Sequence, residues 1–185
     1  MRTRSVAVVL FGVLLGGGAR AQGTLAALPS ARAGAAGAHV EGIVYLLGGE
    51  SDAGSVATVL RYNVRGNEWM AQLSSMAMAR ASAAALAVGT RVYVFGGFGA
   101  VGAGAPRSVE WYDTRRDEWA SAAAIPHERG GHCAVAVGEL AVLFGGVLDS
   151  GGTPSDVFSL ANGTWLAPRA PLPTALAASA WCCRR

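Results

Sequence analysis

The sequence predicts an all-β protein of tandem four-stranded antiparallel units, because three features recur in register along its 185 residues. Gly-Gly doublets follow apolar runs, and their first glycines are 48 and then 49 residues apart. An arginine stands 16 residues before each doublet, and an aromatic residue precedes a tryptophan by seven residues each time. The members of this motif are Arg32, Gly48, Gly49, Tyr62 and Trp69; Arg80, Gly96, Gly97, Tyr112 and Trp119; and Arg129, Gly145, Gly146, Phe158 and Trp165. Three coincident spacings indicate an internal repeat.

Each repeat is expected to form four short strands. The first strands are small and apolar, as a crowded inner strand requires, and a glycine-containing turn leads into second strands rich in β-formers. The third strands carry the aromatic residue, and the fourth strands start at the tryptophan. The expected ranges are 34–40, 43–48 and 59–63; 82–88, 91–96 and 109–113; and 131–137, 140–145 and 156–160. Amphipathic helices are excluded because glycine interrupts the chain about every ten residues and the periodicity is not that of a helix.

These residues resemble the kelch repeat. Gly-Gly after an apolar strand, then Tyr, then Glu-Trp, at a spacing near fifty residues, is typical of that family. Glu68-Trp69 and Glu118-Trp119 match the family's dipeptide, whereas the third repeat has Thr164-Trp165 and has Phe158 in place of Tyr. The resemblance covers Arg32 to Trp165. It implies a kelch-type β-propeller of three four-stranded blades, with the aromatic residues wedged between neighbouring blades.

A fourth repeat is expected to begin near the C-terminus. Leu172–Leu176 copies Leu28–Arg32, with Leu176 where an arginine is expected. The expected repeats are therefore 28–75, 76–124 and 125–171, with a truncated fourth at 172–185. Propellers usually need at least four blades to close, so a partial or open propeller is expected. The chain could be a piece of a longer propeller, could self-associate to complete a ring, or could be a stable open arc.

The N-terminus predicts export. Met1–Arg4 is basic, Val6–Leu15 is an apolar run too short to span a bilayer, and Ala19-Arg20-Ala21 has the form of a signal-peptidase site. We therefore expect cleavage after Ala21, a mature domain of residues 22–185 and a secreted or extracytoplasmic location. An uncleaved anchor or a wrongly assigned start is the alternative. No other stretch resembles a membrane span.

The net charge of +3 comes from three arginines within the first 21 residues, so the mature chain is near neutral. It therefore lacks the excess of basic residues that is expected of a nucleic-acid-binding protein. Cys133 lies in an apolar run and is expected to be a small buried residue, while the roles of Cys182 and Cys183 stay open. An odd number of cysteines allows a free thiol or a bridge between chains.

Strand alternation places the loops after the Gly-Gly doublets and the segments before the first strands on one face. All the loops of variable length lie there, so this face is the expected binding site. The candidate binding residues are Glu50, Asp52, Phe98, Arg107, His127, Glu128 and Asp149. Phe98 could anchor a partner or pack on the blade edge, and the loop acids could form a rim or be merely solvated. Arg32, Arg80 and Arg129 could hold an acidic ligand, but their recurrence favours a structural role as donors to carbonyls or partners in ion pairs.

No cofactor or metal site is expected. His127, His132 and Cys133 do not have a zinc-ligand spacing, and no catalytic grouping or phosphate loop is recognisable. Asn162-Gly163-Thr164 is a possible glycosylation sequon, but Asn-Gly is also a common hairpin turn.

The sequence favours a non-catalytic, exported module that binds a protein or a glycan through the variable loops. Kelch-like folds also include exported enzymes of the galactose-oxidase and sialic-acid-epimerase types, so a fragment of such an enzyme is the alternative. The copper type would need Tyr, Cys and two His together, and no such set is recognisable among the three histidines. An intracellular adaptor of a ubiquitin ligase would need an additional recruitment domain.

Overall fold

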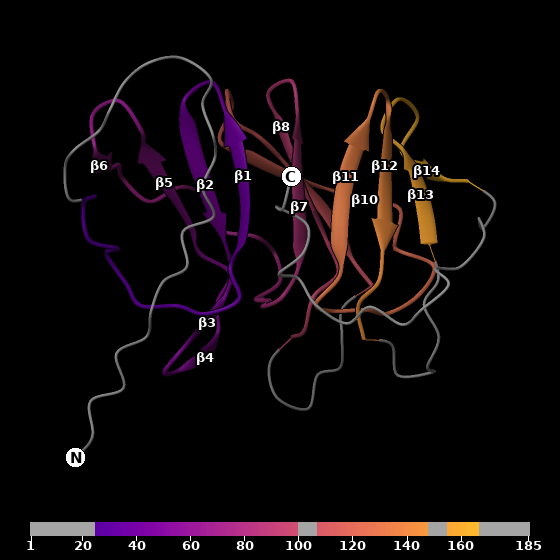
Figure 1. The fold of residues 1–185 in the computed structure, drawn as a ribbon, viewed down its shortest axis with the longest axis horizontal. Helices are drawn as coiled ribbons and strands as arrows, with labels where there is room; N and C mark the ends of the chain where they lie inside the picture. Colours follow the sequence, from indigo (N-terminus) through magenta and orange to yellow (C-terminus); the bar gives the residue numbers. More distant parts are fainter. Residues whose placement is uncertain (1–24, 100–106, 148–154, 167–185) are drawn as a thin grey trace.

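The computed structural model describes residues 25–99, 107–147 and 155–166, and it is an all-β arrangement of three antiparallel four-stranded sheets (Figure 1). The first sheet contains β1 (Ala36–Val40), β2 (Ile43–Leu47), β5 (Val59–Asn63) and β6 (Glu68–Trp69). The second contains β7 (Ala84–Val88), β8 (Arg91–Phe95), β9 (Val109–Asp113) and β10 (Glu118–Ala122). The third contains β11 (Cys133–Val137), β12 (Leu140–Phe144), β13 (Ser155–Ser159) and β14 (Thr164–Trp165). These sheets are the three expected blades, and they form an open propeller.

The strands lie close to their predicted positions, with small shifts at the ends. The inner strands begin two residues later than expected, because Gly34, Ser82 and Gly131 all have positive φ, between 53° and 65°. The second strands end one residue earlier, at the residue before each Gly-Gly doublet, and β13 is shifted by one residue. The fourth strands begin one residue before the tryptophan rather than at it. A residue in the left-handed region cannot continue a strand. This explains why the inner strands start later than expected and why the second strands end before the Gly-Gly doublets.

One element was not predicted. A two-stranded hairpin of β3 (Glu50–Ser51) and β4 (Gly54–Ser55) forms within the loop between β2 and β5. Gly54 has a φ of 107°, and the Ser51 hydroxyl donates to its carbonyl at 3.1 Å. In Figure 1 the hairpin lies at the bottom of the first blade.

The aromatic pairs occupy equivalent places in the three blades. Tyr62, Tyr112 and Phe158 pair with Trp69, Trp119 and Trp165, and the ring centroids are 5.0, 5.1 and 4.9 Å apart. Each indole N–H donates to a backbone carbonyl of the segment before its own blade, at 2.9–3.1 Å. Residues at the same position of the sequence repeat therefore occupy equivalent positions in the three blades.

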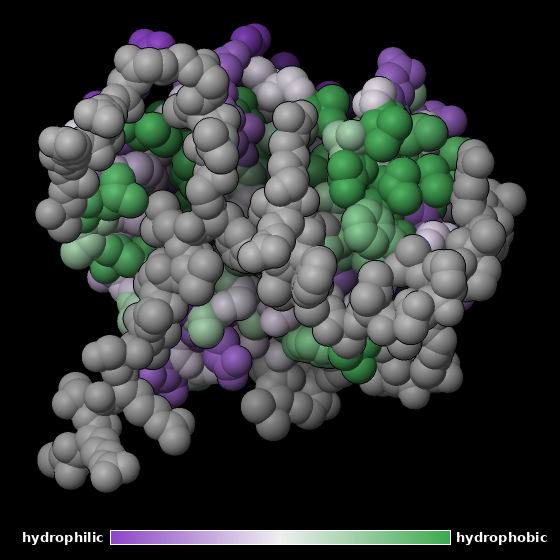
Figure 2. Space-filling model, in the orientation of Figure 1, coloured by the Kyte–Doolittle hydropathy of each residue, from purple (hydrophilic) through white to green (hydrophobic). Residues whose placement is uncertain are grey.

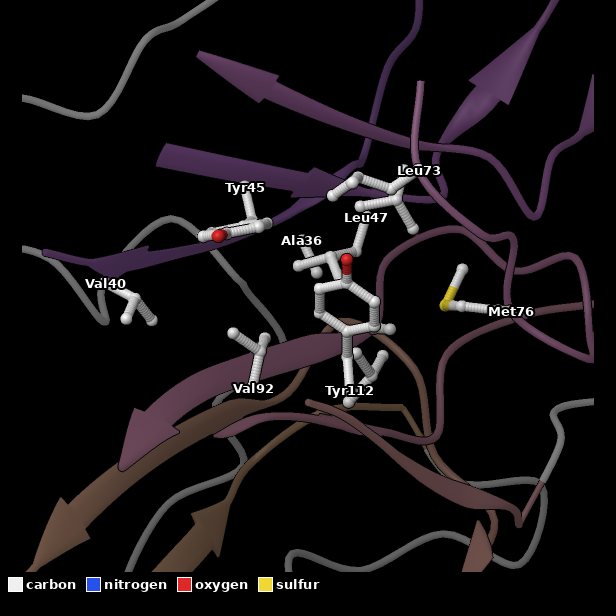
Figure 3. Close-up of a cluster of buried hydrophobic side chains, with 11 residues drawn as sticks. Ala36, Val40, Tyr45, Leu47, Leu73, Met76, Val92 and Tyr112 are labelled. Atoms are coloured by element: carbon white, nitrogen blue, oxygen red, sulfur yellow. The ribbon is translucent and has the colours of Figure 1, made fainter. Parts of the chain in front are cut away.

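The core lies between the blades. Between the first and second blades, Tyr45 and Leu47 of β2 face Val92 and Tyr112 of the second blade, and Met76 of the linker packs into the same cluster (Figure 3). The joint between the second and third blades repeats this arrangement with Tyr93, Phe95, Ile125, Leu143 and Phe158. The linkers therefore contribute large apolar side chains to the joints, Leu73 and Met76 to the first and Ile125 to the second. Burial of such side chains is worth roughly 1.5–3 kcal/mol each.

The inner strands β1, β7 and β11 lie next to one another around the centre. Backbone hydrogen bonds tie them together just before each strand starts. The Ser82 N–H donates to the Gly34 carbonyl at 2.7 Å, and the Gly131 N–H donates to the Ser82 carbonyl at 2.8 Å. The predicted signal peptide and the start of a fourth repeat lie outside the described residues.

Candidate functional site

The candidate site is the end of the blades that carries the long loops. The turns between the first and second strands, and between the third and fourth, lie at the opposite end. The described parts of the loops after the second strands (48–58, 96–99, 107–108 and 145–147) and the linkers at 70–83 and 123–132 share one end, as strand alternation predicted. We call this end the variable-loop face.

Three buried arginines bind the backbone at the base of the loops on this face. The Nη1 atoms of Arg32, Arg80 and Arg129 donate to the carbonyls of Gly48, Gly96 and Gly145 at 3.1, 3.0 and 3.4 Å. Arg80 and Arg129 are completely buried, and Arg32 is 8% exposed. Burial lowers the pKa of each arginine, although the guanidinium group stays protonated. The arginines hold each Gly-Gly corner and are not free to meet a ligand.

Two of these arginines have buried acidic partners that the sequence analysis missed. Glu110 pairs with Arg80, and Asp156 pairs with Arg129; both acids are at most 3% exposed. In the first blade Leu60 occupies the equivalent position, and Arg32 instead donates to the Ser30 hydroxyl at 2.7 Å. An acid two residues before the aromatic, next to apolar residues of the third strand, was the available signal. It was not recognised because the first repeat does not carry it.

The Gly-Gly doublets are required by close backbone approach as well as by positive φ. At Gly96, which has a φ of 53°, a Cβ would lie 2.7 Å from the Arg129 carbonyl of the next blade. At Gly97 a Cβ would lie 2.7 Å from the Ala81 carbonyl of its own blade. The N–H groups of Gly49 and Gly97 also donate to the Arg80 and Arg129 carbonyls at 2.8 and 2.9 Å, so the first two doublets each join two blades. No other residue type fits both demands.

Glu50 and Asp52 lie on the β3–β4 hairpin, and both side chains are exposed. The hairpin reaches across to the second blade, where the Ser55 hydroxyl donates to the Gly99 carbonyl at 3.2 Å. Gly99 directly follows Phe98. The structure therefore brings the acidic hairpin of the first blade beside the loop that carries Phe98.

Phe98 combines the two roles considered for it. Its ring lies over Gly130 of the next blade, where a Cβ would overlap it, yet the residue stays 37% exposed. Its backbone pairs with Ala81 in an isolated bridge. Phe98 is thus a fixed aromatic surface on the variable-loop face.

The remaining candidates lie farther along the same face. Arg107 is exposed and its Nε donates to the Ile125 carbonyl at 2.9 Å, which joins the loop of the second blade to the linker of the third. His127 lies 3.4 Å from the buried Asp156 carboxylate and its side chain is 40% exposed. Glu128 is exposed, and Asp149 lies outside the described residues. The face therefore carries acids on the first blade and Arg107, His127 and Glu128 near the third.

His132 and Cys133 are both buried at the start of the inner strand of the third blade. Neither ring nitrogen of His132 has a hydrogen-bond partner among the described residues, and the residue is 2% exposed. Burial, with a further contribution from the Arg129 guanidinium, lowers the pKa of His132 to about 3. Cys133 is buried, as expected, and it is disulfide-bonded. Within residues 25–99, 107–147 and 155–166, no three His, Cys, Asp or Glu side chains group as metal ligands.

Comparison with known proteins agrees with this geometry. The Kelch motif family matches residues 31–72 and 79–124, which are the first two blades. The first two blades are thus kelch repeats. The third kelch blade lies outside the matched segments, yet it has the same four-stranded sheet and aromatic pair.

Two known proteins illustrate the relationship. Kelch-like protein 34 of Homo sapiens is 36% identical over 113 residues, which are 55% of this chain and 17% of that protein. The solved structure of YjhT superimposes with a TM-score of 0.70 at 21% identity, over 81% of this chain and 55% of YjhT. This kelch chain thus spans a small part of the first protein and about half of the second. In the part of the chain that the structure describes, no helix is long and apolar enough to cross a membrane.

Proposed function

We propose that this kelch chain is a non-catalytic binding module that holds a protein segment on its variable-loop face. The observation that carries the proposal is the fixed, partly exposed ring of Phe98 beside the exposed acids of the β3–β4 hairpin. Aromatic residues surrounded by polar groups are frequent energetic centres of protein interfaces. The buried arginine and Gly-Gly corners beneath them limit movement of the loops, and a rigid surface loses less entropy on binding.

The charges on this face define the ligand that would fit best. Glu50 and Asp52 favour a basic residue, and Phe98 favours an apolar or aromatic neighbour on the same segment. A short peptide containing Lys or Arg next to an apolar residue meets both requirements. A glycan offers neither the basic group nor the large apolar side chain.

We also propose that the module acts outside the cytoplasm. The predicted signal peptide motivates this location, and the disulfide at Cys133 supports it, because disulfides persist mainly in oxidising compartments. Sequencing the N-terminus of the secreted product should give Gln22 as the first residue.

The test starts from a phage-displayed library of random peptides selected on the immobilised mature chain. Peptides that combine Lys or Arg with an apolar residue should be enriched, and E50K should weaken the binding of a selected peptide at least tenfold. The matched control is E41K, because Glu41 is equally an exposed glutamate but lies in a turn at the opposite end of the blades. Equal weakening by E41K and E50K would contradict the assigned face. Failure to enrich any peptide, with binding to an immobilised glycan panel instead, would overturn the choice of a protein ligand.

A further inference from the structure

The third blade exposes an apolar sheet face that is covered in the other two. On the first blade, Val40, Tyr45 and Leu47 are at most 5% exposed because the second blade packs on them. The equivalent Val137 on the third blade is 60% exposed, and Val142 is only partly buried. These valines, with Leu140, Ser155 and Val157, line a shallow apolar depression on β11, β12 and β13. Figure 2 shows hydrophobic side chains gathered over β11 and β12.

The two complete joints show what normally covers this face. The residue four positions before each motif arginine lies against the preceding blade: Met76 is 4% exposed and Ile125 is completely buried. Met76 Cε and Ile125 Cδ1 would lie 3.1 and 3.0 Å from a Cβ on Gly48 and Gly96, respectively. Their N–H groups donate to the Ala57 and Arg107 carbonyls of the preceding blade at 3.0 and 2.8 Å. After this linker, the inner strand of the next blade follows.

The chain beyond Leu166 has the length and pattern needed to repeat this arrangement. Leu172 stands four positions before Leu176, in the register of Met76 and Ile125. The inner strand of a fourth blade would then fall at 180–184, because β7 and β11 begin four residues after their motif arginines. Cys182 and Cys183 fall within this range. Successive inner strands are neighbours in the structure, as β1 and β7 and then β7 and β11 show.

A separate observation places a cysteine at the right position. Cys133, the first residue of β11, is disulfide-bonded, and the chain contains only two other cysteines. An inner strand beside β11 would bring those two cysteines next to the strand that carries Cys133. The repeat register and the disulfide therefore lead independently to the same neighbour for β11.

We propose that residues 167–185 dock on the exposed face of the third blade, with Leu172 in the joint and Cys133 bridged to Cys182 or Cys183. The inference rests on the fold and not on the proposed binding function. Forming the bridge joins two sulfur atoms and removes two protons and two electrons. The electrons and protons pass to the disulfide of a thiol–disulfide oxidoreductase in the compartment to which the chain is exported, and that disulfide is reduced to two thiols.

Peptide mapping of the non-reduced, mature chain by mass spectrometry tests the bridge. We expect a peptide containing Cys133 linked to the C-terminal peptide, and one free thiol per chain in denaturant. In C133S both remaining cysteines should be free, which gives two thiols per chain, whereas a bridge between Cys182 and Cys183 would leave none. A free Cys133 in the unmodified chain would overturn the proposal. A link between two chains, seen as a covalent dimer on a non-reducing gel, would assign the face to a second copy instead.

Hydrogen exchange tests the docking apart from the bridge. L172S should increase the exchange rate of peptides covering β11–β13 at least tenfold. L25S is the control, because Leu25 is 51% exposed and lies ahead of the first blade, so exchange in β11–β13 should not change. Unchanged exchange in L172S would show that Leu172 does not cover the face. If L172S does not fold, the peptide map of the unmodified chain and the thiol count of C133S still decide the proposal.

Discussion

Replacing Glu110 by glutamine tests the buried ion pairs that hold the Gly-Gly corners. Arg80 is completely buried, Glu110 is 3% exposed, and the Ala77 N–H donates to Glu110 Oε2 at 2.7 Å. E110Q keeps the size and shape of the side chain but leaves the Arg80 charge buried without a counter-charge. Breaking a buried pair in this way usually costs 3–5 kcal/mol, and because glutamine can retain part of the hydrogen bonding we expect about 3 kcal/mol.

Urea unfolding monitored by tryptophan fluorescence measures the effect. The midpoint should fall while the dependence on urea concentration stays constant, which indicates a change in stability without a change in the surface exposed. E118Q makes the same substitution at an exposed glutamate of the same blade and should change the free energy of unfolding by less than about 0.5 kcal/mol. A loss below about 1 kcal/mol in E110Q would refute the view that this pair holds the corner.

Three further predictions concern single residues. H132A introduces the residue type found at the same repeat position in the other blades, Ala35 and Ala83. The pKa of His132 is lowered to about 3 in the folded chain, whereas the histidine of the unfolded chain keeps a pKa near 6.5. As the pH falls from 7 to 5, the unfolded chain therefore binds a proton that the folded chain does not. The free energy of unfolding should fall by about 2 kcal/mol over this range because of His132. Urea titrations at both pH values should show that H132A loses this part of the dependence; an identical dependence would contradict the buried, neutral histidine. G96A should destabilise the chain by about 1–3 kcal/mol more than G89A in thermal unfolding, because both glycines have φ near 55° but only Gly96 lies against the next blade; equal effects would remove the close-approach argument. F98S should weaken binding of a selected peptide at least tenfold in fluorescence titrations made where unfolding curves show the variant to be folded, because the ring also packs over Gly130; unchanged affinity would exclude Phe98 from the site.

The blades were predictable because their signals recur. Positive φ and close approach restrict the Gly-Gly positions to glycine, and the tryptophans must meet an aromatic partner at a fixed register. These demands are the same in each blade, so the spacing in the sequence gives the arrangement in space. Strand alternation also placed the loops after the Gly-Gly doublets and the linkers at one end of the blades.

Features that occur once were not predictable. The β3–β4 hairpin consists of two-residue strands, Glu50–Ser51 and Gly54–Ser55, which contain no β-branched or aromatic residue to mark them in the sequence. Glu110 and Asp156 were missed because Leu60 breaks the pattern, and Ser82 takes a positive φ that glycine has at the equivalent positions. The disulfide at Cys133 could not be inferred, because neither a partner nor a distance can be read from three cysteines.

A crystal structure of the mature chain would test the central claim most directly, because the fold depends on equivalent joints between kelch blades. The account predicts Trp69, Trp119 and Trp165 at equivalent places, each with its indole N–H on the linker carbonyl at Ala26, Ser74 or Ala123. Tryptophans in unrelated environments, or three sheets that do not share a common centre, would contradict it.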